Sequence, residues 1–465
     1  MINSLPFNPM KLFDATVYTN RRKSLMQAMG QGQFFFPGAI EQPFNYKANP
    51  FPFRQDSTFL YYFGFAQPGM AGLIDADAGV STLFGHDIDI EEVVWMGPQP
   101  SMAERARLIG AEQHAEFETV TEVLKGKKIQ YLPPYHADRI LYLAKVLAKG
   151  VDEIQSDHSM PLVYAVIKQR SHKASEEIIQ MEEALAITAA MHTQLRKSTA
   201  AGKYEAQLRG IAEGVAFANQ GRLSYGAICT VQGQTLHNNE YHRMLKEGGM
   251  LLCDIGAENQ MGYAGDITRV YPVSPKFSVQ QADIYDLVLK AETESIAAVR
   301  PGVKYMDIHL GAARIITEGL QQLGLMKGDV DESVGAGAHA LFFPHGLGHM
   351  IGLDVHDMEN LGEINVGYDG SVQRSTQFGT AYLRLARPLE TGFVLTVEPG
   401  IYFIPELIDM WEGEGKFKEY IQYEKLKPYR NFTGIRIEDN VLVTASGNRV
   451  LGTPIPKNRN DVERG

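Results

Sequence analysis

Two aspartates flank a short polar stretch near the middle of the chain. Asp254 lies at the end of an apolar strand in the segment 250–256, and Asp266 lies in the segment 262–269 that follows. A hairpin that turns near Gln260 would place the two carboxylates nearly opposite each other, about 5 Å apart at Cβ. Bare carboxylates that close repel each other, whereas a pair of metal ions about 3.5–4 Å apart would use both. Without metal, the same pattern describes a surface hairpin with two solvated aspartates.

A cluster of histidines lies further along the chain. His345, His349 and His356 fall within twelve residues, although the whole sequence has only 13 histidines. The glycines between the first two argue against a helix, so these two imidazoles need not share a helical face. The cluster is typical either of a ligand set or of structural, hydrogen-bonded histidines.

Two glutamates follow in segments that alternate like β-strands. The run 394–398 ends at Glu398, and the run 435–439 places Arg436 and Glu438 on one face of a strand. Each glutamate, taken singly, is equally typical of an exposed carboxylate at a sheet edge.

Together these segments offer four carboxylates and one imidazole to a metal site. The candidate ligands are Asp254, Asp266, His349, Glu398 and Glu438. Ligands this rich in oxygen suit Mn²⁺, with Co²⁺ or Zn²⁺ as possible substitutes. The composition excludes an all-cysteine or histidine-rich zinc site, since the chain has only two cysteines.

The composition is that of a globular protein with two domains. The 465 residues exceed one ordinary core, and 44% are apolar and 21% charged. The 44 basic and 55 acidic residues give a net charge of −11, which disfavours nucleic acid and anionic membranes as partners. No stretch has the length of an apolar membrane span, and residues 1–6 lack the layout of a signal peptide. Because Cys253 lies in an apolar run and Cys229 is the only other cysteine, we expect a cytoplasmic protein.

A polar stretch over residues 168–175 predicts a domain boundary. Before it, helical and strand patterns are mixed. Residues 60–65 are expected to form a buried strand, and residues 71–75 and 81–84 a strand pair joined by a tight turn.

After the boundary, strands and helices alternate. A helix capped by Ser175 carries apolar residues at helical spacing, beginning at Ile178. A second long helix is expected over about residues 280–299, because Pro301 and Gly302 end it.

The five candidate ligands and their local sequences resemble the creatinase-like, pita-bread metallopeptidase family. All five match the family's motif in order and context. Within the family, residues 53–59 and 95–97 resemble the N-terminal domain of aminopeptidase P and prolidase. Residues 380–400 and 403–430 are most similar to prolidase.

The resemblance implies an α/β (α+β) protein with an N-terminal mixed α/β domain over residues 1–172 and a pita-bread catalytic domain over residues 173–465. It further implies a homodimeric enzyme that hydrolyses the Xaa-Pro bond of dipeptides or short peptides with proline at the second position. A non-catalytic peptide-binding protein on the same fold is the alternative. The choice between prolidase and aminopeptidase P stays open.

In this family, five side chains together bind two divalent metal ions. The resemblance implies that Asp254 holds one ion and that His349 and Glu398 hold the other. It implies that Asp266 and Glu438 bridge the two ions.

The resemblance also implies residues that meet the substrate. They are His237, His345, His356, Tyr225, Thr268, Arg384 and Arg436. Tyr225 and Thr268 match positions near the bridging water, and Arg384 matches an arginine that meets the substrate carboxylate in prolidase. Glu398 is the expected proton acceptor, and His345 or His356 is expected to stabilise the oxyanion.

Overall fold

The computed structural model describes residues 11–463. The chain divides into two compact units, one running up to Arg170 and one from Ser171 onward, with the short segment Met358–Gly362 grouping with the first unit. Over the described range, none of the helices combines the length and the hydropathy that crossing a bilayer requires.

The first unit is built on a five-stranded mixed sheet of order β6-β5-β4-β1-β7. Its elements are α1 (Ala15–Met29), β1 (Gln33–Pro37), β2 (Pro43–Tyr46), β3 (Asn49–Pro50), α2 (Ser57–Phe63), β4 (Ala71–Asp75), β5 (Val80–Gly85), α3 (Ile90–Met96), α4 (Met102–Leu108), β6 (Gln113–Glu116), α5 (Val120–Leu124), β7 (Ile129–Gln130), α6 (Ala137–Leu147), α7 (Val151–Ser156) and α8 (Met160–Ser171). The predicted strand pair is confirmed as β4 and β5, which pair antiparallel. Phe35, Leu73 and Phe84 from three of the strands pack with Leu143 of α6 in the core.

The strand predicted over residues 60–65 is wrong, because these residues belong to helix α2. Asp56 caps the helix by accepting a hydrogen bond from the Phe59 amide at 2.8 Å, and Gly64 ends it in the left-handed conformation. All seven helical residues are buried. Burial on every side removes the polar face that would have shown the helical period.

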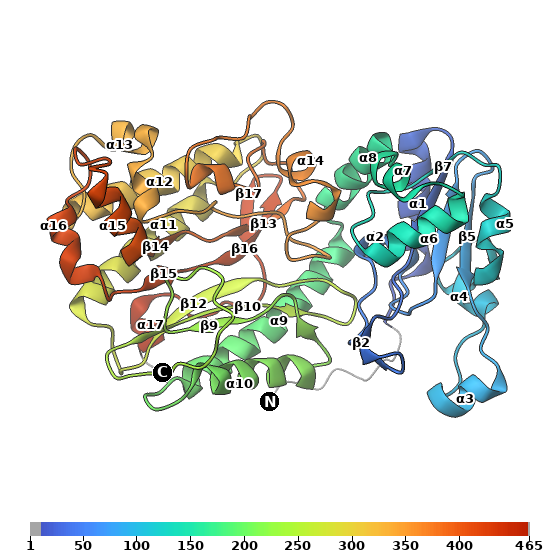
Figure 1. Cartoon of the computed structure of the whole chain (residues 1–465), viewed down its shortest axis with the longest axis horizontal. Helices are drawn as coiled ribbons and strands as arrows, with labels where there is room; N and C mark the ends of the chain where they lie inside the picture. The colour runs from blue at the N-terminus through green and yellow to red at the C-terminus, as the bar shows by residue number, and fades with distance from the viewer. Residues whose placement is uncertain (1–10, 464–465) are drawn as a thin grey trace. The chain divides into compact units, whose positions relative to one another are not determined.

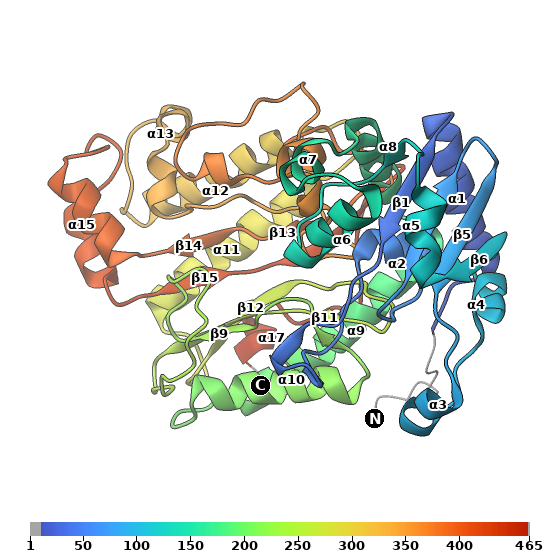
Figure 2. The same cartoon turned by 45° about the vertical axis from the view of Figure 1, so that its right-hand side comes forward.

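The second unit contains several small antiparallel sheets and two long helix pairs. Its elements are α9 (Ser175–Ser198), α10 (Glu205–Ala218), β8 (Arg222–Leu223), β9 (Ile228–Thr230), β10 (Met250–Ile255), β11 (Ala257–Glu258), β12 (Ile267–Pro272), α11 (Val279–Ala298), α12 (Tyr305–Gln322), α13 (Val330–Ala336), α14 (Glu363–Gly367), β13 (Val394–Val397), β14 (Gly400–Tyr402), α15 (Pro405–Gly413), α16 (Tyr423–Leu426), β15 (Gly434–Arg436), β16 (Asp439–Thr444), β17 (Gly447–Val450) and α17 (Arg459–Glu463). The sheets run β12-β10-β9, β11-β8, β13-β16-β17 and β14-β15. In Figures 1 and 2 the strands of the sheet β12-β10-β9 lie between two helix pairs. One pair is α9 and α10, and the other is α11 and α12.

Both predicted long helices are present, as α9 and α11. The cap of α9 is Ala174 rather than Ser175, which is the first helical residue. The Glu177 carboxylate accepts a hydrogen bond from the Ala174 amide at 3.0 Å, so the first turn is closed from inside the helix. Helix α11 begins after Ser278, whose side chain caps it.

Candidate active site

A cavity of about 550 Å³ opens in the second unit. Among the described residues, all the predicted site residues except Thr268 line it. They are Tyr225, His237, Asp254, Asp266, His345, His349, His356, Arg384, Glu398, Arg436 and Glu438. Thr268 lies behind Glu438, to which its hydroxyl donates a hydrogen bond of 2.6 Å.

The two aspartates come from the hairpin formed by β10 and β12. Asp254 pairs with Thr268, and Ile255 pairs with Ile267, so the hairpin is centred one residue later than predicted and Asp266 is not directly opposite Asp254. The carboxylates still share one face, because residues two apart on a strand point the same way. The Tyr225 hydroxyl lies 2.6 Å from Asp254 Oδ1 and also contacts Asp266 Oδ1.

His349 approaches this pair from a segment that lies along β13. Its backbone amide donates to the Thr396 hydroxyl at 3.0 Å, and the Thr396 amide donates to its carbonyl at 2.9 Å. The ring Nδ1 is 3.0 Å from the Met350 carbonyl, which can only accept, so Nδ1 carries the proton. Nε2 faces Asp266 Oδ2 at 3.5 Å and Glu398 Oε1 at 3.6 Å.

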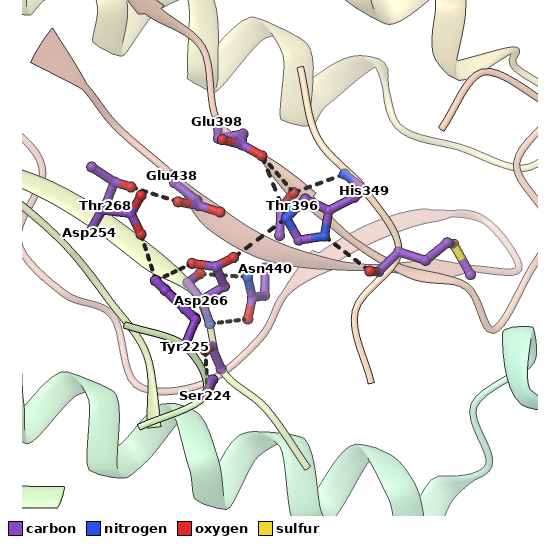
Figure 3. Close-up of polar contacts among 12 residues, drawn as sticks. Ser224, Tyr225, Asp254, Asp266, Thr268, His349, Thr396, Glu398, Glu438 and Asn440 are labelled. Carbon is purple, nitrogen blue, oxygen red and sulfur yellow. Dashed lines mark hydrogen bonds and ion pairs between the residues drawn. The ribbon is translucent and has the colours of Figure 1, made fainter. Parts of the chain in front are cut away.

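In the neutral ring, Nε2 would turn its lone pair toward two carboxylates, which is unfavourable unless a cation lies between them. The Met350 carbonyl holds His349 in the tautomer that a metal-binding histidine adopts. Figure 3 shows the side chains of Asp254, Asp266, His349, Glu398 and Glu438 turned toward one region.

Glu438 supplies a second observation that fits a cation at this site. Its Oε2 accepts from Thr268, but its buried Oε1 has no hydrogen-bond partner among the described residues. Ligand atoms of Asp266, His349 and Glu438 lie within 4.8 Å of one another. An orphaned, buried carboxylate oxygen beside this cluster fits the coordination of a divalent metal ion.

The electrostatics of the carboxylates agree with the geometry. Burial, followed by the charges of Asp254 and Glu398, raises the pKa of Asp266 well above its usual range. Burial and then the charge of Asp266 raise the pKa of Glu438, and burial and then Glu438 raise the pKa of Glu398. Bound cations would remove this cost by stabilising the ionised forms.

A chain of hydrogen bonds runs from Asp254 to His345 through Arg436 and Tyr402. Arg436 Nη2 pairs with Asp254 Oδ2 at 2.5 Å, and its Nη1 donates to the Tyr402 hydroxyl at 2.8 Å. The Tyr402 hydroxyl lies 2.9 Å from His345 Nε2, and His345 Nδ1 lies 2.7 Å from the Gly346 carbonyl. Since that carbonyl can only accept, Tyr402 donates to Nε2. Burial, followed by the charge of Arg436, lowers the pKa of His345 to about 3, so the ring is neutral.

Tyr402 is the residue that the sequence analysis missed. It is fully buried and lies at the end of β14, two positions after Gly400, which pairs with Arg436 across the strands. Alternation along β14 therefore places Tyr402 on the same face as Arg436. Tyr402 lies shortly after the predicted ligand Glu398 in the sequence, and this short spacing could have identified it as a residue of the site.

The remaining predicted residues, His237, His356 and Arg384, line the same cavity. Burial, followed by the charge of Arg436, lowers the pKa of His237. The ring of His356 lies 4.2 Å from the ring of His349, centroid to centroid. Arg384 Nη1 lies 3.3 Å from Glu363 Oε2.

A buried set of carboxylates and one histidine in a cavity of this kind is typical of a metal-dependent hydrolase. The description "Metallopeptidase family M24" matches residues 179–445, so the chain belongs to that family, and "Aminopeptidase P, N-terminal domain" matches residues 18–130. The predicted creatinase-like family and fold class are confirmed.

Relatives of known activity match over most of their length. The chain is 32% identical to the Xaa-Pro dipeptidase of Homo sapiens over 422 residues, covering 88% of this chain and 84% of the human protein. It is 30% identical to the Xaa-Pro aminopeptidase of Escherichia coli (strain K12) over 464 residues, covering 96% of each. The structure of proline aminopeptidase P II from Yersinia pestis superposes with a TM-score of 0.79 at 29% identity, covering 97% of this chain and 99% of that one.

Proposed function

We propose that this chain is a metal-dependent peptidase that hydrolyses the Xaa-Pro bond of short peptides with proline at the second position. The observation that carries the proposal is the convergence of four carboxylates and the Nε2 of His349 in one buried cavity. Relatives on both sides of the family, named Xaa-Pro dipeptidase and Xaa-Pro aminopeptidase, support this substrate class.

Two divalent ions, with Mn²⁺ the preferred metal and Co²⁺ or Zn²⁺ as alternatives, would be held by these five side chains. Asp254 would hold one ion, His349 and Glu398 the other, and Asp266 and Glu438 both. The ligand set is dominated by oxygen, which favours Mn²⁺. When bound, the ions supply a water that is nucleophilic near neutral pH.

The side chains of the chain itself move protons and position the substrate. Glu398 accepts the proton of the attacking water and passes it to the leaving proline nitrogen. His345 or His356 is proposed as the donor to the oxyanion, and both ring nitrogens of His345 already have partners in Tyr402 and the Gly346 carbonyl. His237, whose pKa is lowered, contributes a neutral ring to the same wall.

Arg384 is proposed to bind the carboxylate of a dipeptide. It lines the cavity, and a guanidinium can bind a carboxylate through two parallel hydrogen bonds. Its position supports dipeptides as substrates beside longer Xaa-Pro peptides.

The proposal also covers the location of the enzyme, its oligomeric state and its domain boundary. A cytoplasmic location is supported by Cys229 and Cys253, which are buried free thiols 3.9 Å apart. A homodimer is supported by helix α3, on which Val94 is 76% and Trp95 87% exposed, an apolar surface typical of an interface. We also propose that the two domains divide between residues 172 and 173.

The testing experiment is a peptidase assay with metal-loaded protein. Gly-Pro and Ala-Pro-Ala should both be cleaved before proline, whereas Gly-Ala should not, and a chelator should abolish the reaction. Binding of these peptides without cleavage would instead support a non-catalytic peptide-binding protein.

A further inference from the structure

The guanidinium of Arg384 is already paired with a carboxylate of the chain. Glu363, the first residue of α14, places Oε2 at 3.3 Å from Arg384 Nη1. Its other oxygen contacts Arg374, whose guanidinium lies 5.4 Å from the ring centroid of Tyr368. Two cations and one anion therefore meet around Glu363, and these three groups have a net charge of +1.

The backbone fixes Glu363 beside Arg384. The amides of Ala386 and Arg387 both donate to the Gly367 carbonyl, at 2.9 and 3.0 Å, and the Tyr368 hydroxyl donates to the Leu383 carbonyl at 2.7 Å. A Cβ at Gly367 would lie 1.7 Å from the Arg384 carbonyl oxygen, so only glycine allows this approach. Helix α14 is thus held against the segment that carries Arg384. The backbone therefore keeps Glu363 close to Arg384.

Glu363 and the substrate would compete for the same guanidinium. Arg384 lines the cavity, whereas Glu363 is absent from the lining among the described residues, so Glu363 pairs with the guanidinium from outside the cavity. A dipeptide brings its own carboxylate to the cavity side of Arg384. The negative charge of Glu363 then repels the dipeptide carboxylate, and Glu363 occupies some of the N–H donors of the guanidinium.

We propose that Glu363 is a specificity-determining residue that weakens the recognition of dipeptide carboxylates by Arg384. The inference rests on the proposed Xaa-Pro peptidase function and deepens it. A longer peptide, whose carboxylate lies further out, leaves the Arg384–Glu363 pair intact, so Glu363 shifts the preference of the site from dipeptides toward longer peptides. Specificity of this kind comes from a repulsive element as well as from attraction.

The test compares Gly-Pro with Gly-Pro-amide, which differ only in the terminal charge. Glu363→Gln removes the charge but keeps the shape, and raises the net charge of the cluster from +1 to +2. It should lower KM for Gly-Pro about two- to fivefold, a range set by the partial exposure of the pair, with kcat changed little. KM for the amide should fall much less.

A variant of opposite sign keeps the inference testable if Glu363→Gln does not fold. Arg374→Met removes one of the two cations that pair with Glu363 and leaves Arg384. The KM for Gly-Pro should therefore rise relative to the KM for Gly-Pro-amide. Glu390→Gln is the matched control, because Glu390 pairs with Arg387 on the same segment and neither lines the cavity among the described residues. It should leave the ratio of the two KM values unchanged.

The outcomes separate the inference from the function. Unchanged KM ratios in both Glu363→Gln and Arg374→Met, with normal cleavage by the unaltered enzyme, would overturn the inference alone. An unaltered enzyme that cleaves neither substrate would overturn the proposed function as well. The Glu363→Gln effect should also shrink in an Arg384→Ala background, and an undiminished effect there would show that Glu363 acts by another route.

Discussion

Replacing Thr268 by valine should loosen the metal site without disturbing the fold. The Thr268 hydroxyl is fully buried, donates to Glu438 Oε2 at 2.6 Å and accepts from Arg436 Nε at 3.2 Å. Valine keeps the shape, and the backbone hydrogen bond from the Glu438 amide to the Thr268 carbonyl survives. Only the hydroxyl is lost.

The size of the effect follows from the groups left behind. A buried hydrogen bond to a charged group contributes about 1.5–3 kcal/mol, and removing a partner that orients a metal ligand lowers metal affinity roughly 10- to 100-fold. Both figures describe a change of the same order, since 1.4 kcal/mol corresponds to about a factor of ten. We expect the Kd for Mn²⁺ to rise about 10- to 100-fold.

The assay is calorimetric titration of Mn²⁺ into metal-free protein, with turnover of Gly-Pro measured at saturating metal. Thr268→Ser should restore affinity because it returns the hydroxyl. Thr317→Val is the matched control, because Thr317 is equally buried but donates to the Ala313 carbonyl within α12. Metal affinity in Thr268→Val equal to that of the unaltered protein would refute the role assigned to the hydroxyl.

Three further predictions follow from the site and its surroundings. Asp266→Asn or Glu438→Gln should reduce turnover with Mn²⁺ to background while the circular dichroism spectrum is retained; near-normal turnover in either would show that the bridging ligands are misplaced. Arg384→Ala should raise KM for Gly-Pro about 5- to 100-fold, the range for loss of a charged hydrogen bond at a partly exposed site, and affect Ala-Pro-Ala less; equal losses would remove the case for carboxylate recognition. Burial lowers the pKa of His309 to about 3 and of His339 to about 4, so the unfolded chain binds more protons below pH 6.5 and stability should fall as pH drops from 6.5 toward 4. His339→Gln should reduce that dependence by up to about 1.4 kcal/mol per pH unit in urea unfolding, and an unchanged slope would contradict a contribution from His339.

Much of the local structure followed from pattern, and the errors have local causes. The strand β10 and the helix α11 were predicted because their apolar residues and breakers are clear in sequence. The α2 segment was assigned as a strand because its residues are buried on every side, although Asp56 and Gly64 at its ends carried the cap signals. The hairpin register was off by one residue, which is decided by a turn in which Gly262 takes a φ of 86°.

The convergence of the five candidate ligands could not come from spacing alone. Residues as distant as Asp254 and Glu438 meet through pairing between strands and the packing of segments such as the one that carries His349. Family resemblance named the positions, because each ligand lies in a distinctive local sequence. Tyr402 and Glu363 were not predicted from the sequence. Tyr402 is placed in the site by its contact with Arg436, and Glu363 by its contact with Arg384, and neither contact is visible in the neighbouring sequence.

The most direct test of the account is a metal titration coupled to a peptidase assay. Metal-free protein is titrated with Mn²⁺ while cleavage of Gly-Pro and Gly-Ala is followed, and bound metal is measured in the same samples. The account predicts that activity on Gly-Pro appears only with metal and reaches its plateau at two ions per chain, with Gly-Ala left intact. Full activity in metal-free protein, a plateau at one ion per chain, or no cleavage of any Xaa-Pro peptide at full loading would contradict it.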